Sequence, residues 1–299
     1  MELWIPITIA AAFMQNVRSA LQKVLKASLT TTGATFSRFV FAAPLAAIYL
    51  LALAAFTGNP VPNPDGTFAG YAALGGIAQI LATALLVSLF SKRNFTVGTT
   101  FSKTETVQTA LIGLVLLGER ISAGALMGIA VSLIGVFLIS TRKGIAGGGL
   151  RDMIDRSALT GLASGALFGL SAVSYRAASL SLADGDFLMR AALTLVCVTV
   201  FQSIVMALYM AWREPGQIGA VFKTWRVTAL VGATGMLAST FWFTAMTLQN
   251  AAYVRALGQV ELVFTFAASV LIFRERSTVR ECAGIGLVTA GVLILVLTA

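Results

Sequence analysis

The hydrophobic pattern of the chain consists of long apolar runs separated by short polar connections. A helix needs about 20 mostly apolar residues to cross the hydrocarbon core of a bilayer, which is about 30 Å thick. The pattern therefore predicts an all-α integral membrane protein with ten transmembrane helices. We place them near residues 3–22, 33–56, 68–91, 96–117, 122–141, 157–180, 186–211, 226–247, 252–273 and 278–298.

The composition agrees with a membrane protein. The 299 residues are 58% hydrophobic and only 11% charged, and the mean hydropathy is +0.88. Soluble domains carry about 25% charged residues, so this chain has too few charges to cover a surface that faces water. The net charge of +9 does not indicate a nucleic-acid partner, because the charges form short clusters between apolar runs rather than one basic face.

The residue types argue against most enzyme chemistry. The chain has no histidine, and its cysteines, Cys197 and Cys282, lie singly inside apolar runs. We therefore predict no catalytic residue, no metal and no cofactor. No GxxxxGK[ST] phosphate loop is present, so a gradient rather than ATP would drive transport. The first apolar run has no basic region before it, and we expect a retained helix.

The lysines and arginines of the connections lie almost entirely in every second connection, which predicts the orientation, because basic connections normally stay in the cytoplasm. One set of connections holds fourteen of the 21 basic residues, and the other holds only Arg120. The basic set is Lys23, Lys26, Lys92, Arg93, Arg142, Lys143, Arg151, Arg156, Arg213, Lys223, Arg226, Arg274, Arg276 and Arg280. We therefore predict a multi-pass protein of the plasma membrane (the inner membrane, in a bacterium) with both termini outside.

The two halves of the chain resemble each other when one is shifted by 156 positions. Without a gap between about residues 73 and 140, the shift places Glu105 on Glu261 and Asn94 on Asn250. Polar matches of this kind rarely arise by chance inside apolar runs. Because each half holds an odd number of predicted helices, the second half would enter the membrane in the opposite orientation.

This repeat predicts the domain organisation. We expect a first five-helix repeat at residues 1–145, a cytoplasmic linker at 146–156 and a second five-helix repeat at 157–299. The two repeats would surround a central cavity. Inverted repeats of this kind are the architecture behind alternating access in many secondary transporters.

Two matching segments also carry a family resemblance. The first is Leu116-Leu117-Gly118-Glu119-Arg120 with Gly128 and Ile134-Gly135-Val136, and the second is Arg274-Glu275-Arg276 with Gly284 and Ala290-Gly291-Val292. In both halves a glutamate lies fourteen residues before the glutamate of the segment, and Thr106 or Leu262 follows it where many relatives have proline. The chain resembles the drug/metabolite transporter superfamily, in its ten-helix branch of EamA-like carriers.

The resemblance implies a basket of eight helices around a central cavity, with the fifth and tenth helices packed outside. Members of this superfamily export amino acids and related metabolites, or carry nucleotide sugars, sugar phosphates or drugs. The resemblance does not select among these solutes.

Glu105 and Glu261 are the strongest candidates for the solute site. Each lies about nine residues into its predicted helix, or about 13 Å along it, close to the middle of the membrane. A charge at that depth is costly and normally faces a cavity or a partner. Ser102 and Thr109 share a helix face with Glu105, and Thr265 shares one with Glu261, so we predict that these faces line the cavity. The alternative is that each glutamate is structural and bonds to a neighbouring helix.

Lys103 and Arg255 would add positive charge to this site. Lys103 is about 200° around the helix from Glu105, so we predict that it meets a carboxylate on another helix. A base and a glutamate together would form a two-ended site for a zwitterion such as an amino acid. Further predicted wall residues, for which packing or an interfacial place is the alternative, are Gln79, Trp242, Tyr253 and Gln259.

Four more arginines lie within predicted helices near their ends, and we predict gating or interfacial roles for them, because long side chains can reach the headgroups. They are Arg18, Arg38, Arg176 and Arg190. The fifth and tenth predicted helices carry a glycine ridge of Gly124, Gly128, Gly135 and Gly291. Close packing explains this ridge, and homodimerisation through it is the alternative.

The sequence thus predicts a secondary transporter that exports amino acids or related metabolites by alternating access. Its partners would be a small-molecule substrate and the lipid bilayer, with protons as an open choice of coupling ion and a monomer or a homodimer as the assembly. The alternative is a multidrug, lipid-precursor or nucleotide-sugar carrier of the same fold. A membrane-embedded enzyme is the remote alternative.

Overall fold

The chain was analysed as a computed structural model, which describes residues 2–25, 28–89, 101–140, 156–271 and 278–299. Within these ranges the regular structure is helical and contains no strand. The helices are α1 (Trp4–Leu25), α2 (Thr31–Thr57), α3 (Gly66–Leu89), α5 (Glu105–Leu117), α6 (Ala123–Ser140), α8 (Arg156–Ser181), α9 (Phe187–Arg213), α10 (Gln217–Lys223), α11 (Trp225–Leu248), α12 (Ala251–Leu257), α13 (Val260–Leu271) and α14 (Val279–Thr298).

The long helices have the length and composition of membrane spans. In the described part of the chain, six helices are long and apolar enough to cross a bilayer, namely α2, α3, α8, α9, α11 and α14. The shorter apolar helices are α5 and α6. The predicted all-α membrane architecture is therefore confirmed, while the count of ten spans stays a prediction.

Local sequence signals explain where α2 begins and ends. Thr30 is its N-cap, and the hydroxyl of Thr30 accepts a hydrogen bond from the Gly33 amide at 3.1 Å. Side-chain oxygens at this position satisfy amides that have no partner within the helix. Gly58 ends the helix with a φ of 70°, a conformation that glycine adopts at little cost.

The helices predicted at 96–117 and 252–273 are interrupted, which is a correction to the sequence analysis. In the second half, α12 ends at Leu257 and α13 begins at Val260. In the first half, α5 begins at Glu105 after a turn. Neither turn contains a proline, and the sequence analysis took the polar residues beside both turns as positions on continuous helices.

The chain folds into two compact units that do not follow the two halves of the sequence. The first unit comprises Met1–Ile77 and Ser174–Gln249, and the second comprises Ala78–Val173 and Asn250–Ala299.

Several predicted features lie outside the described residues, namely the linker 146–156 up to its last residue, Lys26, Lys92, Arg93, Asn94, Arg142, Lys143, Arg151, Arg274, Glu275 and Arg276.

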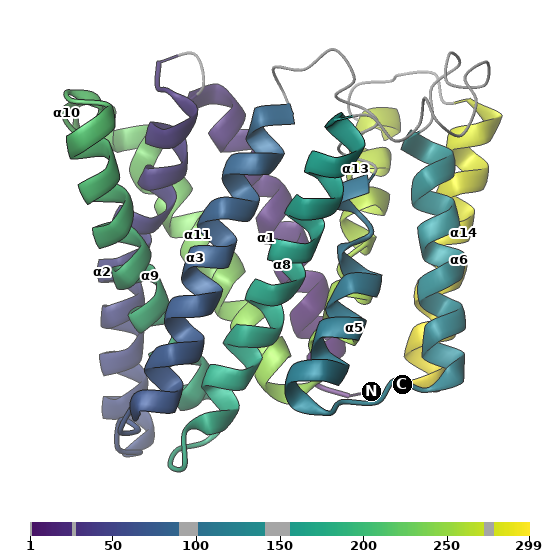
Figure 1. Cartoon of the computed structure of the whole chain (residues 1–299), viewed down its shortest axis with the longest axis horizontal. Coiled ribbons are helices and arrows are strands. Elements are labelled where there is room, and N and C mark those ends of the chain that lie inside the picture. The colour runs from purple at the N-terminus through teal and green to yellow at the C-terminus, as the bar shows by residue number, and fades with distance from the viewer. Residues whose placement is uncertain (1, 26–27, 90–100, 141–155, 272–277) are drawn as a thin grey trace. The chain divides into compact units, whose positions relative to one another are not determined.

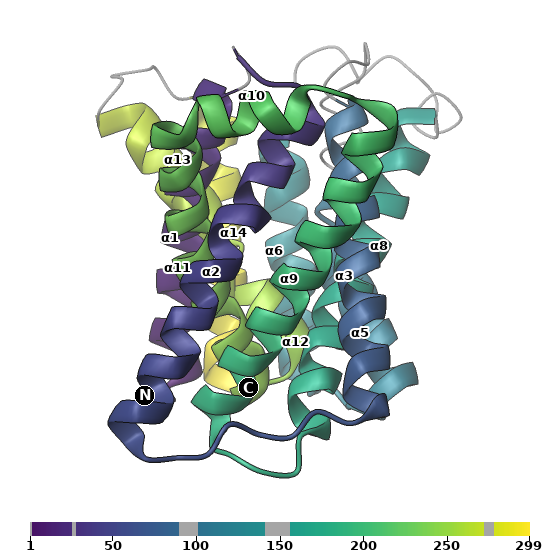
Figure 2. The same cartoon turned by 90° about the vertical axis from the view of Figure 1, so that its left-hand side faces the viewer.

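In the first unit, α1 packs along α11, and α2 packs against α9 and α11. Gly232 of α11 lies directly against Phe41 of α2, where a side chain on the glycine would collide with the phenylalanine. Tyr175 of α8 stacks on Phe243 of α11 with ring centroids 4.6 Å apart, and its hydroxyl accepts a hydrogen bond from Gln202 of α9 at 3.3 Å. The short helix α10, which the sequence analysis did not predict, runs crosswise to α9 and α11 (Figure 2).

In the second unit, α6 and α14 lie side by side at close range (Figure 1). A Cβ on Gly128 would lie 2.7 Å from the carbonyl oxygen of Gly291, and a Cβ on Gly135 would lie 2.6 Å from that of Gly284. Only glycine permits such an approach of two backbones. This glycine ridge is therefore used for packing within the chain, and a homodimer would need a different surface of these helices.

Candidate functional site

Both candidate glutamates lie at the start of a helix that follows a tight turn. The amide of Thr104 bonds to the carbonyl of Phe101 at 3.2 Å, and the amide of Glu261 bonds to the carbonyl of Gly258 at 3.1 Å. Hydrogen bonds over three residues are typical of 3₁₀ turns. Glu105 and Glu261 therefore fall in the first turns of α5 and α13, where free amides and the helix dipole favour a negative charge.

Glu261 forms an ion pair with a lysine from the other half of the sequence. The ammonium of Lys103 lies 2.5 Å from a carboxylate oxygen of Glu261 and donates a hydrogen bond to it. Both side chains are partly exposed, 32% for Lys103 and 16% for Glu261. Neither side chain is fully buried, and each member neutralises the charge of the other.

Glu105 forms the second ion pair. A guanidinium nitrogen of Arg255 lies 3.6 Å from a carboxylate oxygen of Glu105, with exposures of 13% and 18%. This separation is longer than a hydrogen bond, so the attraction is mainly electrostatic. The four charges of the two pairs sum to zero.

The two ion pairs are not copies of each other, although the two glutamates are 156 positions apart. The same shift places Lys103 on Gln259 and Arg255 on Thr99, a neutral residue outside the described ranges. Each glutamate is therefore bound by a base from the other half of the sequence. The arrangement fits both readings made from the sequence, a charged site for solute and structural pairing with a neighbouring helix.

The predicted polar faces differ in their surroundings. The hydroxyl of Thr109 donates to the carbonyl of Glu105 at 2.6 Å, and that of Thr265 donates to the carbonyl of Glu261 at 2.9 Å. Thr109 is fully buried, whereas Thr265 is exposed. Ser102 is also buried, and its carbonyl lies against Gly165 of α8. The face around Thr109 is therefore packed against protein, and the two faces are not equivalent.

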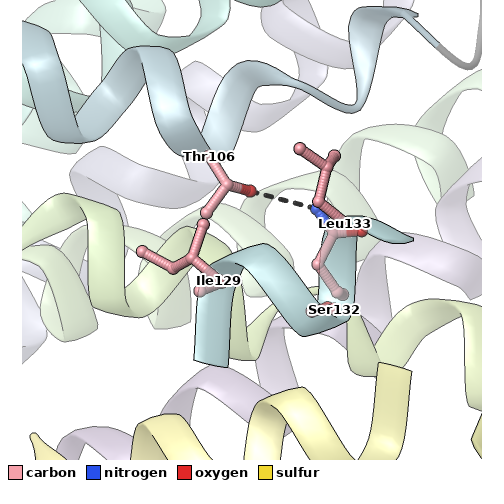
Figure 3. A pocket seen from close by; sticks show the side chains of 6 residues that line it. Thr106, Ile129, Ser132 and Leu133 are labelled. Atoms are coloured by element: carbon pink, nitrogen blue, oxygen red, sulfur yellow. Dashed lines mark hydrogen bonds between the residues drawn. The ribbon is translucent and has the colours of Figure 1, made fainter. Parts of the chain in front are cut away.

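A small cavity lies beside the two turns (Figure 3). The volume that the centre of a water molecule can occupy in this cavity is about 10 Å³. This is enough for about one water molecule. The amide of Gln259 donates to the hydroxyl of Thr106 at 3.1 Å at its edge. The Gln259 amide oxygen and the Ser132 hydroxyl are buried and make no hydrogen bond within the described part of the chain. The lining residues are Thr106, Ile129, Ser132, Leu133, Ala256 and Gln259.

The other predicted wall residues are buried in packing positions. The Tyr253 hydroxyl accepts a hydrogen bond from the amide of Ser122 at 3.0 Å, in the second unit. Gln79 belongs to the same unit and is 9% exposed. Trp242 belongs to the first unit, where its indole donates to Gln15 at 3.1 Å. Of the predicted wall residues, Gln259 is the one that the structure brings together with the turns.

Two of the four arginines near helix ends bind backbone carbonyls. Arg176 of α8 donates to the carbonyls of Met246 and Gln249, each at 2.7 Å, at the C-terminus of α11. Arg190 donates to the carbonyl of Gly185 at 3.0 Å in the turn before α9. Cations stabilise a helix C-terminus, so these contacts stabilise the end of α11.

The other two arginines belong to the first unit. Arg18 is 8% exposed, so burial argues against the interfacial position predicted for it. The side-chain stems of Arg18 and Arg38 both lie beside Gly235 of α11. The guanidinium carbon of Arg38 lies 5.1 Å from the ring centroid of Phe39.

Thr106 and Ser132 line the cavity but were not predicted as site residues. Thr106 directly follows Glu105 and stands where many relatives have proline, a departure that could have drawn attention to it. Ser132 gives no such signal, because the 156-residue shift places it on Val288 and it lies within an apolar run.

The comparison with known families decides the identity of the fold. The sequence pattern of the EamA-like transporter family matches residues 2–141 and again residues 156–297. The chain belongs to the EamA-like transporter family. The two matches show that it has the two-repeat EamA fold. This family consists of membrane transporters of small solutes rather than enzymes, so the protein is a multi-pass transporter of this type.

A solved structure supports the same fold. The chain aligns with a crystal structure titled only as that of a protein, with a TM-score of 0.73 and 14% identity. The alignment covers 98% of this chain and 96% of that one. At this identity the likeness shows that the two chains share a fold and nothing more. A comparison with curated proteins finds no match.

Proposed function

We propose that this EamA-like transporter is a secondary carrier of the plasma membrane that exports amino acids or closely related metabolites by alternating access. The observation that carries the proposal is the pair of crossed ion pairs, Lys103 with Glu261 and Arg255 with Glu105, at two helix starts. The substrate class, the direction of transport and the alternating-access mechanism are parts of this proposal. Transport of small solutes follows from membership of the family.

The charges of these pairs match those of a zwitterion. An ammonium group of a substrate would compete with Lys103 for Glu261, and a carboxylate would compete with Glu105 for Arg255. A charge separated from its partner in a poorly hydrated site is strongly disfavoured. A substrate that carries both charges displaces Lys103 and Glu105 together, one cation and one anion, so the net charge of the site stays at zero. A substrate with one charge would displace one of them and leave the occupied site with a net charge.

The interrupted helices support a moving site. Helices that break near the membrane midplane expose backbone groups that a substrate can bind, and many secondary transporters with inverted repeats use them. In this chain the turns at Thr104 and Gly258 directly precede the two glutamates. Rotation at either turn would lengthen one ion pair, so that opening of the site and loss of the pair occur together.

Transport by the purified protein in vesicles tests the proposal. Vesicles preloaded with a mixture of labelled amino acids should release one or a few of them faster than protein-free vesicles. Lys103→Met and Glu261→Gln should each reduce this release at least about tenfold, whereas Lys223→Met should leave it unchanged. Lys223 is the matched control because it is an exposed lysine of α10 and belongs to the other unit.

Two outcomes contradict the proposal. If the protein releases hydrophobic drugs, lipid precursors or nucleotide sugars and no amino acids, its substrates are of another class than proposed. If Lys103→Met and Glu261→Gln both transport amino acids at the wild-type rate, transport does not depend on this ion pair.

A further inference from the structure

Two Trp-Arg pairs flank the short helix α10 in the first unit. Trp212 and Arg213 are the last two residues of α9. Trp225 and Arg226 are the first two residues of α11. Both α9 and α11 are long and apolar enough to cross a bilayer. Since only residues 214–224 separate the two helices, both pairs lie on the same side of the membrane.

In both pairs the arginine lies over the ring of its tryptophan. The guanidinium carbon of Arg213 is 4.4 Å from the ring centroid of Trp212. The guanidinium carbon of Arg226 is 5.9 Å from the ring centroid of Trp225. A guanidinium at this distance is attracted by the negative face of the ring. The same arrangement of a cation beside an indole therefore occurs at the end of one span and at the start of the next.

The two tryptophans of these pairs are exposed, unlike the other two tryptophans of the chain. Trp212 is 74% exposed and Trp225 is 57% exposed, whereas Trp4 and Trp242 are 3% and 7% exposed. Helix packing therefore covers little of the two rings. A tryptophan at the end of a membrane span normally lies among the lipid headgroups, because its ring is apolar and its N–H group is polar. We therefore place both pairs at the level of the headgroups.

The helix α10 lies across the ends of α9 and α11 rather than along them (Figure 2). Its buried residue is Val221, and the ring of Phe222 packs against that of Phe41 on α2 with centroids 5.7 Å apart. Before α10, the hydroxyl of Thr30 donates a hydrogen bond to the carboxylate of Glu214 at 2.8 Å. These contacts hold α10 against α2, in the orientation of a helix that lies along a membrane surface.

The segment 212–226 carries more positive than negative charge. It contains three basic residues, Arg213, Lys223 and Arg226, all exposed, and one acidic residue, Glu214. Within the described part of the chain, no carboxylate forms an ion pair with either arginine. Basic side chains near the membrane surface are attracted by acidic lipids. The charge of this segment is therefore available to the headgroups beside it.

We propose that segment 212–226 binds the headgroups of acidic phospholipids, with Arg213 and Arg226 on the phosphate groups. The planar fork of arginine donates two parallel hydrogen bonds, which suits a phosphate. Three bases against one acid favour an acidic headgroup, because a zwitterionic headgroup brings no net charge to neutralise the surplus. The segment belongs to the first unit and the crossed ion pairs to the second. The proposal therefore goes beyond amino-acid export and does not depend on it.

Quenching of tryptophan fluorescence by brominated lipids tests the proposal. The full-length protein is reconstituted in phosphatidylcholine vesicles that contain either phosphatidylglycerol or phosphatidylcholine brominated near the glycerol end of the acyl chains. The quenching reports mainly on Trp212 and Trp225, because the other two tryptophans are buried. Each basic residue near a membrane surface strengthens binding of acidic lipid about fivefold. The wild type should therefore be half-quenched at a mole fraction of brominated phosphatidylglycerol at least about fivefold lower than that of brominated phosphatidylcholine.

Paired substitutions assign this preference to the segment. The double variant Arg213→Gln/Arg226→Gln should be quenched equally by the two brominated lipids, and its Tm in pure phosphatidylcholine should match that of the wild type. The matched control is Arg156→Gln/Arg280→Gln, which removes two exposed arginines at the starts of α8 and α14. The control loses the same charge and should keep the preference of the wild type.

Lysine variants keep the experiment decisive if the glutamine variant does not fold. Arg213→Lys/Arg226→Lys retains both charges and loses both forks, so its preference for phosphatidylglycerol should fall at least about twofold. A wild type with no preference overturns the proposal and leaves the segment to free anions or to another protein. The proposal is equally overturned if the glutamine or lysine variant keeps the full preference, or if the control loses as much as the glutamine variant.

Discussion

The ammonium of Lys103 lies 2.5 Å from the carboxylate of Glu261, although the two residues are 158 positions apart in the sequence. Arg255, six positions before Glu261, pairs in turn with Glu105, two positions after Lys103. Each segment thus contributes one acid and one base. A change in the position of one segment against the other must alter both pairs together, which is what a coupled site requires.

Removal of one partner of the Lys103–Glu261 pair should destabilise the protein, and removal of both should restore it. Lys103→Met or Glu261→Gln leaves one charge without its partner. Loss of one member of a fully buried pair costs about 3–5 kcal/mol, and we expect less here because both side chains are partly exposed. The double variant should regain most of the Tm and remain inactive in transport. A double variant that transports normally would contradict a role for this pair in solute binding.

Glu105→Gln tests proton coupling. Gln keeps the size of Glu105 and removes its charge and its ability to titrate. If protons are coupled through this carboxylate, the substitution should flatten the pH dependence of transport in vesicles. Glu281→Gln, at the N-terminus of α14 and outside the site, is the control. An unchanged rate and an unchanged pH profile for Glu105→Gln would remove this residue from the mechanism.

Gly291→Ala should destabilise the packing of α6 against α14. The new methyl group would lie 2.5 Å from the carbonyl oxygen of Gly128, so the helices must move apart. Such overpacking costs about 1–3 kcal/mol. Gly286→Ala, on the same helix, meets nothing within 4 Å and should match the wild type or gain slightly from helix propensity. Equal Tm values for the two variants in detergent would contradict the packing described here.

Arg176→Met distinguishes a structural role from the gating role predicted from the sequence. Its guanidinium caps the carbonyls at the end of α11, and hydrogen bonds from a charged group contribute about 1.5–3 kcal/mol. The variant should therefore lose stability, while transport per folded molecule stays close to that of the wild type. Arg213→Met, an exposed arginine at the end of α9, should change neither. A normal Tm with altered transport rates would favour gating.

The predicted orientation can be tested by cysteine labelling. In a variant that lacks Cys197 and Cys282, a cysteine at Ala299 should react with a membrane-impermeant maleimide in intact cells. A cysteine at Lys143, in a predicted cytoplasmic connection, should react only after permeabilisation. The opposite pattern would reverse the topology, since the prediction depends on the distribution of basic residues.

Much of the fold was open to prediction from the sequence. The predicted spans at 33–56 and 278–298 agree with α2 and α14 to within two residues at each end. Long apolar runs have few alternatives, because backbone groups in lipid must be satisfied within the helix. The turns before Glu105 and Glu261 were not predicted in this way, because they contain no proline and their polar residues, Lys103 and Gln259, were interpreted as positions on continuous helices.

The sequence by itself determined that the chain is a helical membrane protein built from two related halves, and it singled out Glu105, Glu261, Lys103 and Arg255 as the charges that need an explanation. Only the tertiary structure decided which base meets which acid, because that depends on helices more than 150 positions apart and on turns that shift their register. It also decided that the side-chain stems of Arg18 and Arg38 lie beside Gly235. A sequence can show that a charge lies within a membrane helix, but the partner of that charge is fixed by packing.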